Sequence, residues 1–408
     1  MSETSTRAAG LRISLLYATF FGGIGFFMPY FPLWLLGRGL SEREIGMVLA
    51  VGPLTRVFAA PLAAQLADRV RDVGLVLALT SMGMVAGVVA LGLAPSFGWL
   101  LLAMVFCAMF WGPTGALTEA FTAGVIHRRP SLQYGRMRLW GSISFMVASI
   151  GGGFIVDRIA PANIIWAQLL FIAPAAAAAI LLLRWMRAET APRAVPDAMS
   201  EQPGSQRTAT LALVILGYTV IQASHMMVMN FGSIHWQKLG FSGAFLGAAW
   251  SVGVVLEIGL LFAASNFVST AKSAFLILAM SGAVAAFRWL VLAHDVPGWV
   301  ILIVQASHGF TYGLAHVSTM FLLARFGNPS GRARLQGWMA SSIAATSAAA
   351  SWLSGVLYAN YGQTGFLGMI PIAIAGAVLI LIAYLSARGS NGGQPQTSGG
   401  GGTTTLPS

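Results

Sequence analysis

Apolar stretches of about 20 residues recur along the whole chain, and each is long enough to cross a lipid bilayer as a helix. Of the 408 residues, 57% are hydrophobic and only 9% are charged, whereas soluble domains are about a quarter charged. The stretches also lack the even alternation that is typical of a membrane β-barrel. We therefore expect an all-α membrane protein with twelve transmembrane helices, at residues 11–36, 44–65, 74–94, 98–126, 136–157, 161–186, 210–235, 243–265, 272–293, 298–325, 334–358 and 365–387.

A polar segment separates the twelve predicted helices into two sets of six. It contains three prolines and few apolar residues, which is typical of a flexible linker. The chain after Arg388 is rich in Gly, Ser, Thr and Pro and cannot bury a core, so we expect it to be disordered. The sequence thus predicts an N-terminal bundle at 1–187, a cytoplasmic linker at 188–208, a C-terminal bundle at 209–388 and a tail at 389–408.

Most of the 23 Lys and Arg residues lie in the loops on one side of the predicted bundle. Loops that are rich in Lys and Arg remain in the cytoplasm. We therefore expect both termini there, in a multi-pass protein of the bacterial inner membrane. The loops on the other side hold only four cations, Arg38, Arg43, Arg158 and Lys238.

The net charge of +11 does not indicate nucleic-acid binding, because the cations occupy short loops and form no stripe interleaved with aromatic side chains. Cys107 is the single cysteine and lies in an apolar stretch, so no disulfide within the chain and no metal framework is expected. We predict no cofactor and no catalytic cluster. The expected partners are a small-molecule substrate, protons and the lipid bilayer around a monomer.

The two predicted bundles share a sequence repeat. At an offset of 196 residues, the run Gly135–Gly141 matches the run Gly331–Gly337 at five of seven positions. An offset of 201 places the first outer loop of each half in register, with Gly39 on Gly240 and Ser41 on Ser242. Parallel six-helix repeats with a site at their interface are a standard transporter architecture.

This layout resembles the major facilitator superfamily. The loop Leu66–Arg71, which follows the second predicted helix, is similar to the cytoplasmic loop signature of that superfamily. The usual glycine of the signature is replaced by Ala64, so the match is partial. The resemblance implies two pseudo-symmetric six-helix bundles around a central cavity.

A closer resemblance is to the bacterial phenylpropionate permease group, whose relatives are lactose and nucleoside proton symporters. The runs Tyr134–Ser142 and Trp250–Glu257 carry it, together with His308 and His316. This resemblance implies proton-coupled import. It says little about the substrate, because these relatives accept very different molecules.

Four ionisable residues lie inside predicted helices at matched positions of the repeat. Arg56 corresponds to Glu257, and Glu119 corresponds to His316. Ionisable groups at membrane depth are costly and mark a pathway or a pair. We interpret Arg56 as the receptor of a substrate carboxylate and Glu119, Glu257 and His316 as proton-coupling residues. The alternative is a structural ion pair between Arg56 and Glu257, or a local pair for each.

The tenth predicted helix carries a polar stripe, and a stripe at this depth is expected to face a cavity. Histidines in the stripe could transfer protons, because histidine titrates near neutral pH. Arg288 of the ninth helix is a further proton-coupling candidate, unless it reaches to the membrane surface or neutralises a nearby acid. The stripe consists of Gln305, His308, Tyr312, His316 and Thr319, and substrate binding is predicted for Tyr17, His225, Gln305, His308 and Tyr312 beside Arg56.

Charged residues at the cytoplasmic ends of several predicted helices are interpreted as gate contacts, or as simple topology anchors. They are Asp68, Arg69, Arg136, Arg138, Arg332 and Arg334.

These features favour a proton-coupled importer of a small aromatic monocarboxylate. A proton symporter for a neutral sugar or nucleoside is the first alternative, and an efflux antiporter is another. A membrane enzyme would need a nucleophile–base pair or a metal cluster, and the sequence shows neither. A receptor or assembly factor with a transporter-like scaffold would not need acids and histidines at membrane depth.

Overall fold

The computed structural model describes residues 3–187, 205–327 and 332–389, and within them the chain forms helices and no strand. Most of the predicted linker and the predicted tail, apart from Gly389, lie outside these residues. The helices of the first half are α1 (Glu3–Gly37), α2 (Glu42–Val70), α3 (Val73–Leu93), α4 (Phe97–Arg128), α5 (Tyr134–Val156), η1 (Pro161–Asn163) and α6 (Ile164–Arg187).

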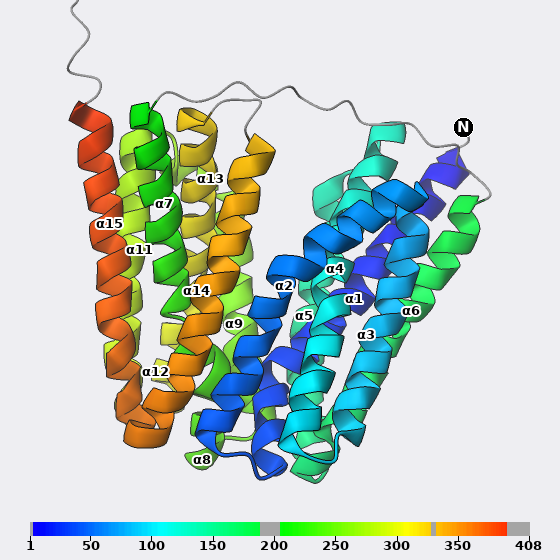
Figure 1. Ribbon diagram of the computed structural model, residues 1–408, viewed down its shortest axis with the longest axis horizontal. Helices are drawn as coiled ribbons and strands as arrows, with labels where there is room; N and C mark the ends of the chain where they lie inside the picture. Colours follow the sequence, from blue (N-terminus) through cyan, green and yellow to red (C-terminus); the bar gives the residue numbers. More distant parts are fainter. Residues whose placement is uncertain (1–2, 188–204, 328–331, 390–408) are drawn as a thin grey trace, which may run out of the picture.

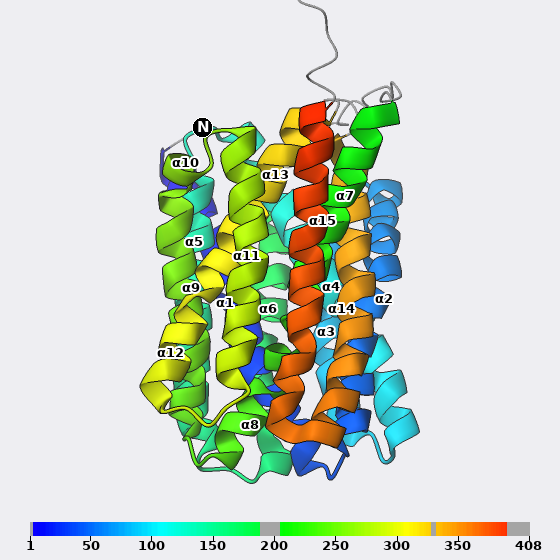
Figure 2. The same cartoon turned by 90° about the vertical axis from the view of Figure 1, so that its left-hand side faces the viewer.

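The second half begins at Ser205, inside the segment that was predicted to be linker. Its helices are α7 (Ser205–Ala223), η2 (Val228–Gly232), α8 (Ser233–Lys238), α9 (Gly243–Phe262), α10 (Ala264–Phe267), α11 (Ala271–Leu292), α12 (Gly298–Ala306), η3 (Gly309–Leu314), α13 (Ala315–Phe326), α14 (Arg332–Tyr361), η5 (Gly362–Met369) and α15 (Ile370–Gly389). The helix α7 packs against α15, α14 and α13, and Figure 2 shows it directly beside α15.

Eleven segments of the described chain are long and apolar enough to cross a membrane. The last of them, Arg334–Arg388, contains both α14 and α15, which η5 joins at the lower end of Figure 1. The predicted twelve transmembrane helices are therefore confirmed. Their ends agree with the predicted ranges to within about ten residues, because apolar side chains mark the membrane core more sharply than the helix ends.

Two transmembrane spans are interrupted by π-helical turns, which the sequence did not predict. Span seven passes from α7 through η2 to α8, and span ten passes from α12 through η3 to α13. A π-helical turn inserts one residue into the helical repeat and is frequent at functional sites. Here η3 begins directly after His308 and contains Tyr312, so it changes the direction of the predicted polar stripe.

The two halves meet along two seams, α2 against α14 and α5 against α9. Gly46 of α2 faces Gly355 of α14 so closely that a Cβ atom on Gly46 would lie 2.7 Å from the Gly355 Cα. At the other seam, Gly153 of α5 packs on the backbone of Gly243. Absent side chains let the backbones of the halves touch, as small residues do between membrane helices.

Polar contacts seal the same end of the molecule. The Asp157 carboxylate accepts hydrogen bonds from the backbone N–H groups of Gly243 (2.6 Å) and Ala244 (3.4 Å) at the start of α9. Lys238 pairs with Glu42 at 3.4 Å across the halves. All these residues lie near the loops that follow spans one, five, seven and eleven, which is the predicted outer end.

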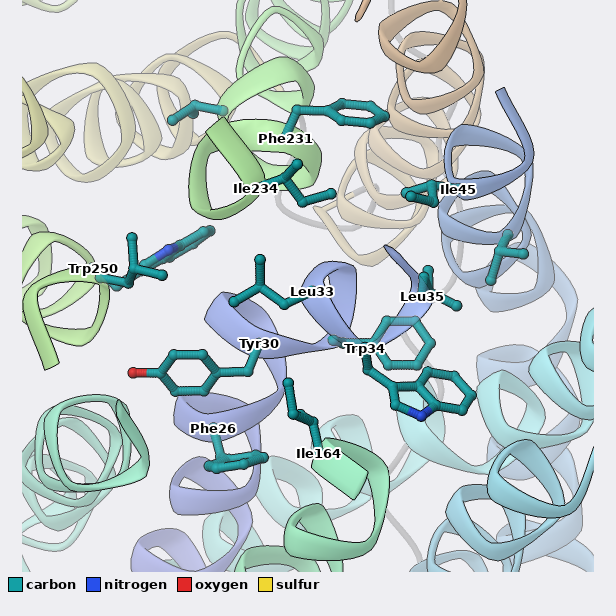
Figure 3. Close-up of a cluster of buried hydrophobic side chains, with 14 of the residues drawn as sticks. Phe26, Tyr30, Leu33, Trp34, Leu35, Ile45, Ile164, Phe231, Ile234 and Trp250 are labelled. Atoms are coloured by element: carbon teal, nitrogen blue, oxygen red, sulfur yellow. The ribbon is translucent and has the colours of Figure 1, made fainter. Parts of the chain in front are cut away.

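The hydrophobic core also joins the two halves at one end of the molecule and not at the other. The largest cluster unites both halves at the sealed end, where Tyr30 and Trp34 of α1 lie among Ile164, Phe231 and Trp250 (Figure 3). Two smaller clusters belong to one half each and lie toward the end with the chain termini. The halves therefore share a core at the predicted outer end and separate toward the predicted cytoplasmic end (Figure 1).

Candidate functional site

In the first half, Glu119 of α4 is the centre of a polar cluster. Its Oε2 accepts hydrogen bonds from the hydroxyl groups of Tyr17 (2.7 Å) and Tyr134 (2.9 Å). Its Oε1 lies 3.7 Å from the Nε atom of Arg138, whose guanidinium group stacks over the Phe21 ring at 3.9 Å. A charged acceptor with several donors and a nearby cation is a strong arrangement, so this cluster is electrically balanced within its own half.

In the second half, Arg288 of α11 is the centre of a different network. It is 1% exposed, and its Nη1 donates to the Thr311 hydroxyl oxygen at 2.8 Å while its Nη2 donates to the Gln305 side-chain oxygen at 3.1 Å. The His225 Nε2 atom lies 3.0 Å from the same Thr311 oxygen, and Gln222 donates to the Thr311 backbone oxygen at 3.1 Å. In the described part of the chain, this buried guanidinium group has neutral hydrogen-bond partners only.

His308 and Tyr312 form the edge of this network. Their rings stack at a centroid distance of 5.0 Å, and the His308 ring lies edge-on to the His225 ring at 5.8 Å. Tyr312 is 41% exposed although it lies in the middle of span ten. A polar aromatic side chain at this depth that keeps solvent access is expected to line a water-filled cavity.

Arg56 and Glu257 approach these groups from opposite halves. Arg56, an exposed side chain of α2, passes Gly112 and is within electrostatic range of Tyr312. The Glu257 side chain packs on Gly313 of η3 and is within electrostatic range of Arg138. The predicted residues of the two halves thus approach one another across the interface.

His316 lies one turn of helix beyond Tyr312, on α13. Its Nδ1 atom is 3.2 Å from the Tyr218 hydroxyl group, and Tyr218 is in turn within electrostatic range of Glu257 and Tyr312. The polar residues therefore form a continuous series from Arg288 to His316. His225 belongs to it as a buried member whose ring nitrogens both have protein partners, the second being the Ile221 backbone oxygen at 3.0 Å.

The predicted gate residues occupy two different places. Asp68, Arg69, Arg136 and Arg334 are exposed near the open end of the halves, and the side chain of Arg332 lies outside the described residues. Arg138 lies deeper, in the Glu119 cluster. Because the halves are apart at this end, a gate role for these residues stays a prediction for the opposite conformation.

Sequence reasoning missed three partners, Tyr134, Tyr218 and Thr311. Tyr134 was noted only as part of the run Tyr134–Ser142 that carries the family resemblance, and Tyr218 gave no signal. Thr311 is the counterpart of Thr114 at an offset of 197, and that match was the available signal. Among the described residues, no three His, Cys, Asp or Glu side chains converge as metal ligands would.

A polytopic helical bundle with a polar series of residues between two matched halves is the architecture of a membrane transporter. The comparisons with known proteins agree. The chain belongs to the MFS_1 like family, whose sequence model matches residues 11–367. Its relatives and structural neighbours are transporters and not enzymes.

Two curated relatives cover most of the chain. The probable 3-phenylpropionic acid transporter of Escherichia coli (strain K12) is 29% identical over 373 residues, which are 89% of this chain and 94% of the relative. The maltose permease of Geobacillus stearothermophilus is 26% identical over 305 residues, 74% of this chain and 75% of the relative.

Solved structures share the fold at low sequence identity. The nucleoside transporter NupG has a TM-score of 0.68 at 15% identity, with 93% of this chain and 98% of that chain covered. A transporter of the POT family, solved in complex with a thioalcohol-conjugated peptide, has a TM-score of 0.70 at 10% identity, with coverage of 93% and 96%.

Proposed function

We propose that this transporter imports a small aromatic monocarboxylate together with a proton by alternating access. Arg56 carries the proposal, because its side chain lies exposed at mid-span and pairs with no carboxylate among the described residues. A guanidinium group matches a carboxylate with two parallel hydrogen bonds. Tyr312 is within electrostatic range of Arg56 and its ring stacks on that of His308, a surface that suits a flat substrate.

The proposed substrate class agrees with the name of the Escherichia coli relative, a probable 3-phenylpropionic acid transporter. The maltose permease relative supports the rival, a neutral sugar. A neutral substrate would leave Arg56 without an anion in the membrane interior, where unpaired charge is expensive. Arg56 therefore favours the carboxylate.

For the proton-coupling residue, we propose Glu257 in preference to Glu119. Glu119 already has two hydroxyl donors and the Arg138 guanidinium group as partners. The Glu257 carboxylate has no hydrogen-bond partner among the described residues and packs against the π-helical turn η3. A carboxylate without hydrogen-bond partners can exchange a proton without disrupting a preformed cluster.

The test is equilibrium binding of labelled 3-phenylpropionate to the purified protein, with maltose and uridine as competitors. Arg56→Ala should raise the Kd on the order of 100-fold, since loss of the charged hydrogen-bond partner of the bound carboxylate costs about 3 kcal/mol. The Kd of Arg56→Lys should lie between those of wild type and Arg56→Ala, because lysine retains the charge and loses the bidentate geometry. Arg158→Ala is the control, since the Arg158 side chain is exposed and donates to the Phe154 backbone oxygen one turn earlier. Binding of maltose or uridine without binding of the acid would contradict the proposal.

A further inference from the structure

Two buried polar atoms in the Arg288 network have no hydrogen-bond partner within the described part of the chain. One is a donor, the Nε–H of Arg288, and the other is an acceptor, the side-chain oxygen Oε1 of Gln222. Both side chains are nearly inaccessible, at 1% and 4% exposure. A buried donor or acceptor that stays unpaired costs roughly 1–3 kcal/mol, so such atoms are rare without a reason.

The two atoms belong to a single cluster, because both side chains bind Thr311. Arg288 donates to the Thr311 hydroxyl oxygen and Gln222 donates to the Thr311 backbone oxygen. The second contact also fixes the orientation of the Gln222 amide, since a flipped amide would place Oε1 against a carbonyl oxygen. The Thr311 backbone oxygen therefore fixes Oε1 of Gln222 as the unpaired acceptor.

The position of Arg288 in its helix makes the cluster more unusual. Arg288 lies four residues before the end of α11 at Leu292, near the predicted outer surface. Its side chain leans toward the start of the helix, as side chains in α-helices do, and so reaches Thr311 in the middle of span ten. A cation is thus held away from the nearer water at considerable cost.

A hydroxyl group complements this pair of atoms. It can accept a hydrogen bond from the Arg288 Nε–H and donate one to the Gln222 Oε1. A carboxylate would satisfy the donor and repel the acceptor. A carbon–hydrogen group would leave both unpaired.

We propose that this pair binds a ring hydroxyl group, so that the preferred substrates are hydroxylated aromatic monocarboxylates. The inference rests on the proposed function, in which Arg56 receives the carboxylate. His308 and Tyr312 connect the two ends, because Tyr312 is within electrostatic range of Arg56 and His308 is within electrostatic range of Arg288. The ring of the substrate lies along these two stacked rings, with its hydroxyl group at Arg288 and Gln222.

The test compares the affinities of the full-length protein for 3-phenylpropionate and for its meta- and para-hydroxylated analogues, by competition with the labelled parent acid. Wild type should bind the better hydroxylated analogue roughly tenfold more tightly, since sites with polar groups for a hydroxyl discriminate strongly against its absence. Gln222→Leu should remove this preference and retain binding of the parent acid.

Gln168→Leu is a closely matched control. Gln168 is 2% exposed and donates through Nε2 to the Gly23 backbone oxygen. Its Oε1 is also unpaired among the described residues, but it lies in the first half, where they include no unpaired buried side-chain donor. This variant should retain the preference for the hydroxylated acid.

Equal affinities in wild type, or a preference that survives Gln222→Leu, would overturn this inference and leave the proposed function standing. A bound water molecule would then be the occupant of the pair. Failure of all three acids to bind would overturn the proposed function, and this inference with it.

Discussion

Arg138 and Arg288 are the guanidinium groups of the two polar clusters, one in each half, and they have different surroundings. Arg138 is partly exposed, lies 3.7 Å from the Glu119 carboxylate and stacks on an aromatic ring. Arg288 is buried and has Thr311 and Gln305 as neutral partners. The first cluster contains its own counter-charge, whereas the second lacks one among the described residues.

The repeat therefore duplicates the helices but not their chemistry. The counterpart of Arg138 in the second half is Arg334, which is exposed and stacks on Trp338 of its own helix. The counterpart of Glu119 is His316, which contacts Tyr218. An acid and its cation in one half thus correspond to groups with other partners in the second. Such a difference suits a binding site in which the charges of one cluster are already paired and the other cluster can pair with a ligand.

The comparison can be broken by giving the Arg288 cluster an acid of its own, since none pairs with Arg288 among the described residues. Gln305→Glu places a carboxylate where an amide oxygen now lies, 3.1 Å from Arg288 Nη2. We expect the melting temperature of the purified protein to rise by a few degrees, because a buried cation gains a partner. Binding of 3-phenylpropionate should weaken roughly tenfold, since the added negative charge repels the anion.

The reciprocal change is Glu119→Gln, which removes the acid from the first half. It should lower the melting temperature by a few degrees at most, because the Arg138 side chain is 33% exposed and water can solvate it. The contrary result is a fall in melting temperature for Gln305→Glu that is as large as the fall for Glu119→Gln. It would show that the charge of Arg288 is already fully stabilised by its neutral partners.

A smaller effect distinguishes the two hydroxyl donors of the first cluster. Tyr17 is fully buried and Tyr134 is 45% exposed, yet both donate to the same Glu119 oxygen. Tyr17→Phe should reduce stability by about 1 kcal/mol and Tyr134→Phe by clearly less, because water can replace the second hydroxyl group. Equal losses in the free energy of unfolding, measured with denaturant, would indicate that water reaches neither hydroxyl group.

The smallest expected effect is at the sealed end, where the halves are joined by the exposed pair Glu42–Lys238. Glu42→Gln should change stability by less than about 1 kcal/mol. Asp157→Asn should have a larger effect, since it weakens two contacts to the start of α9. If Glu42→Gln lowered the melting temperature more than Asp157→Asn, the main polar contact of the sealed end would be at α2 and not at α5.

Much of the fold was predictable because hydrophobicity reports directly on membrane spans. The repeat also matched Arg56 with Glu257 at equivalent positions of the two halves. The π-helical turns at Val228 and Gly309 were not predictable, since they depend on packing between spans. For the same reason the sequence placed Arg138 with the cytoplasmic rim, whereas the structure shows it beside Glu119.

The central claim is coupled import through the unbalanced second half, and the initial rate of 3-phenylpropionate uptake into proteoliposomes tests it most directly. Initial rates are needed because the protonated acid also crosses lipid unaided, so protein-free liposomes supply the background. An inward proton gradient should raise the wild-type rate at least tenfold above the rate without a gradient, and Glu257→Gln should lose this stimulation while still exchanging labelled for unlabelled acid. A wild-type rate above background that is indifferent to the gradient, or full stimulation in Glu257→Gln, would contradict the account.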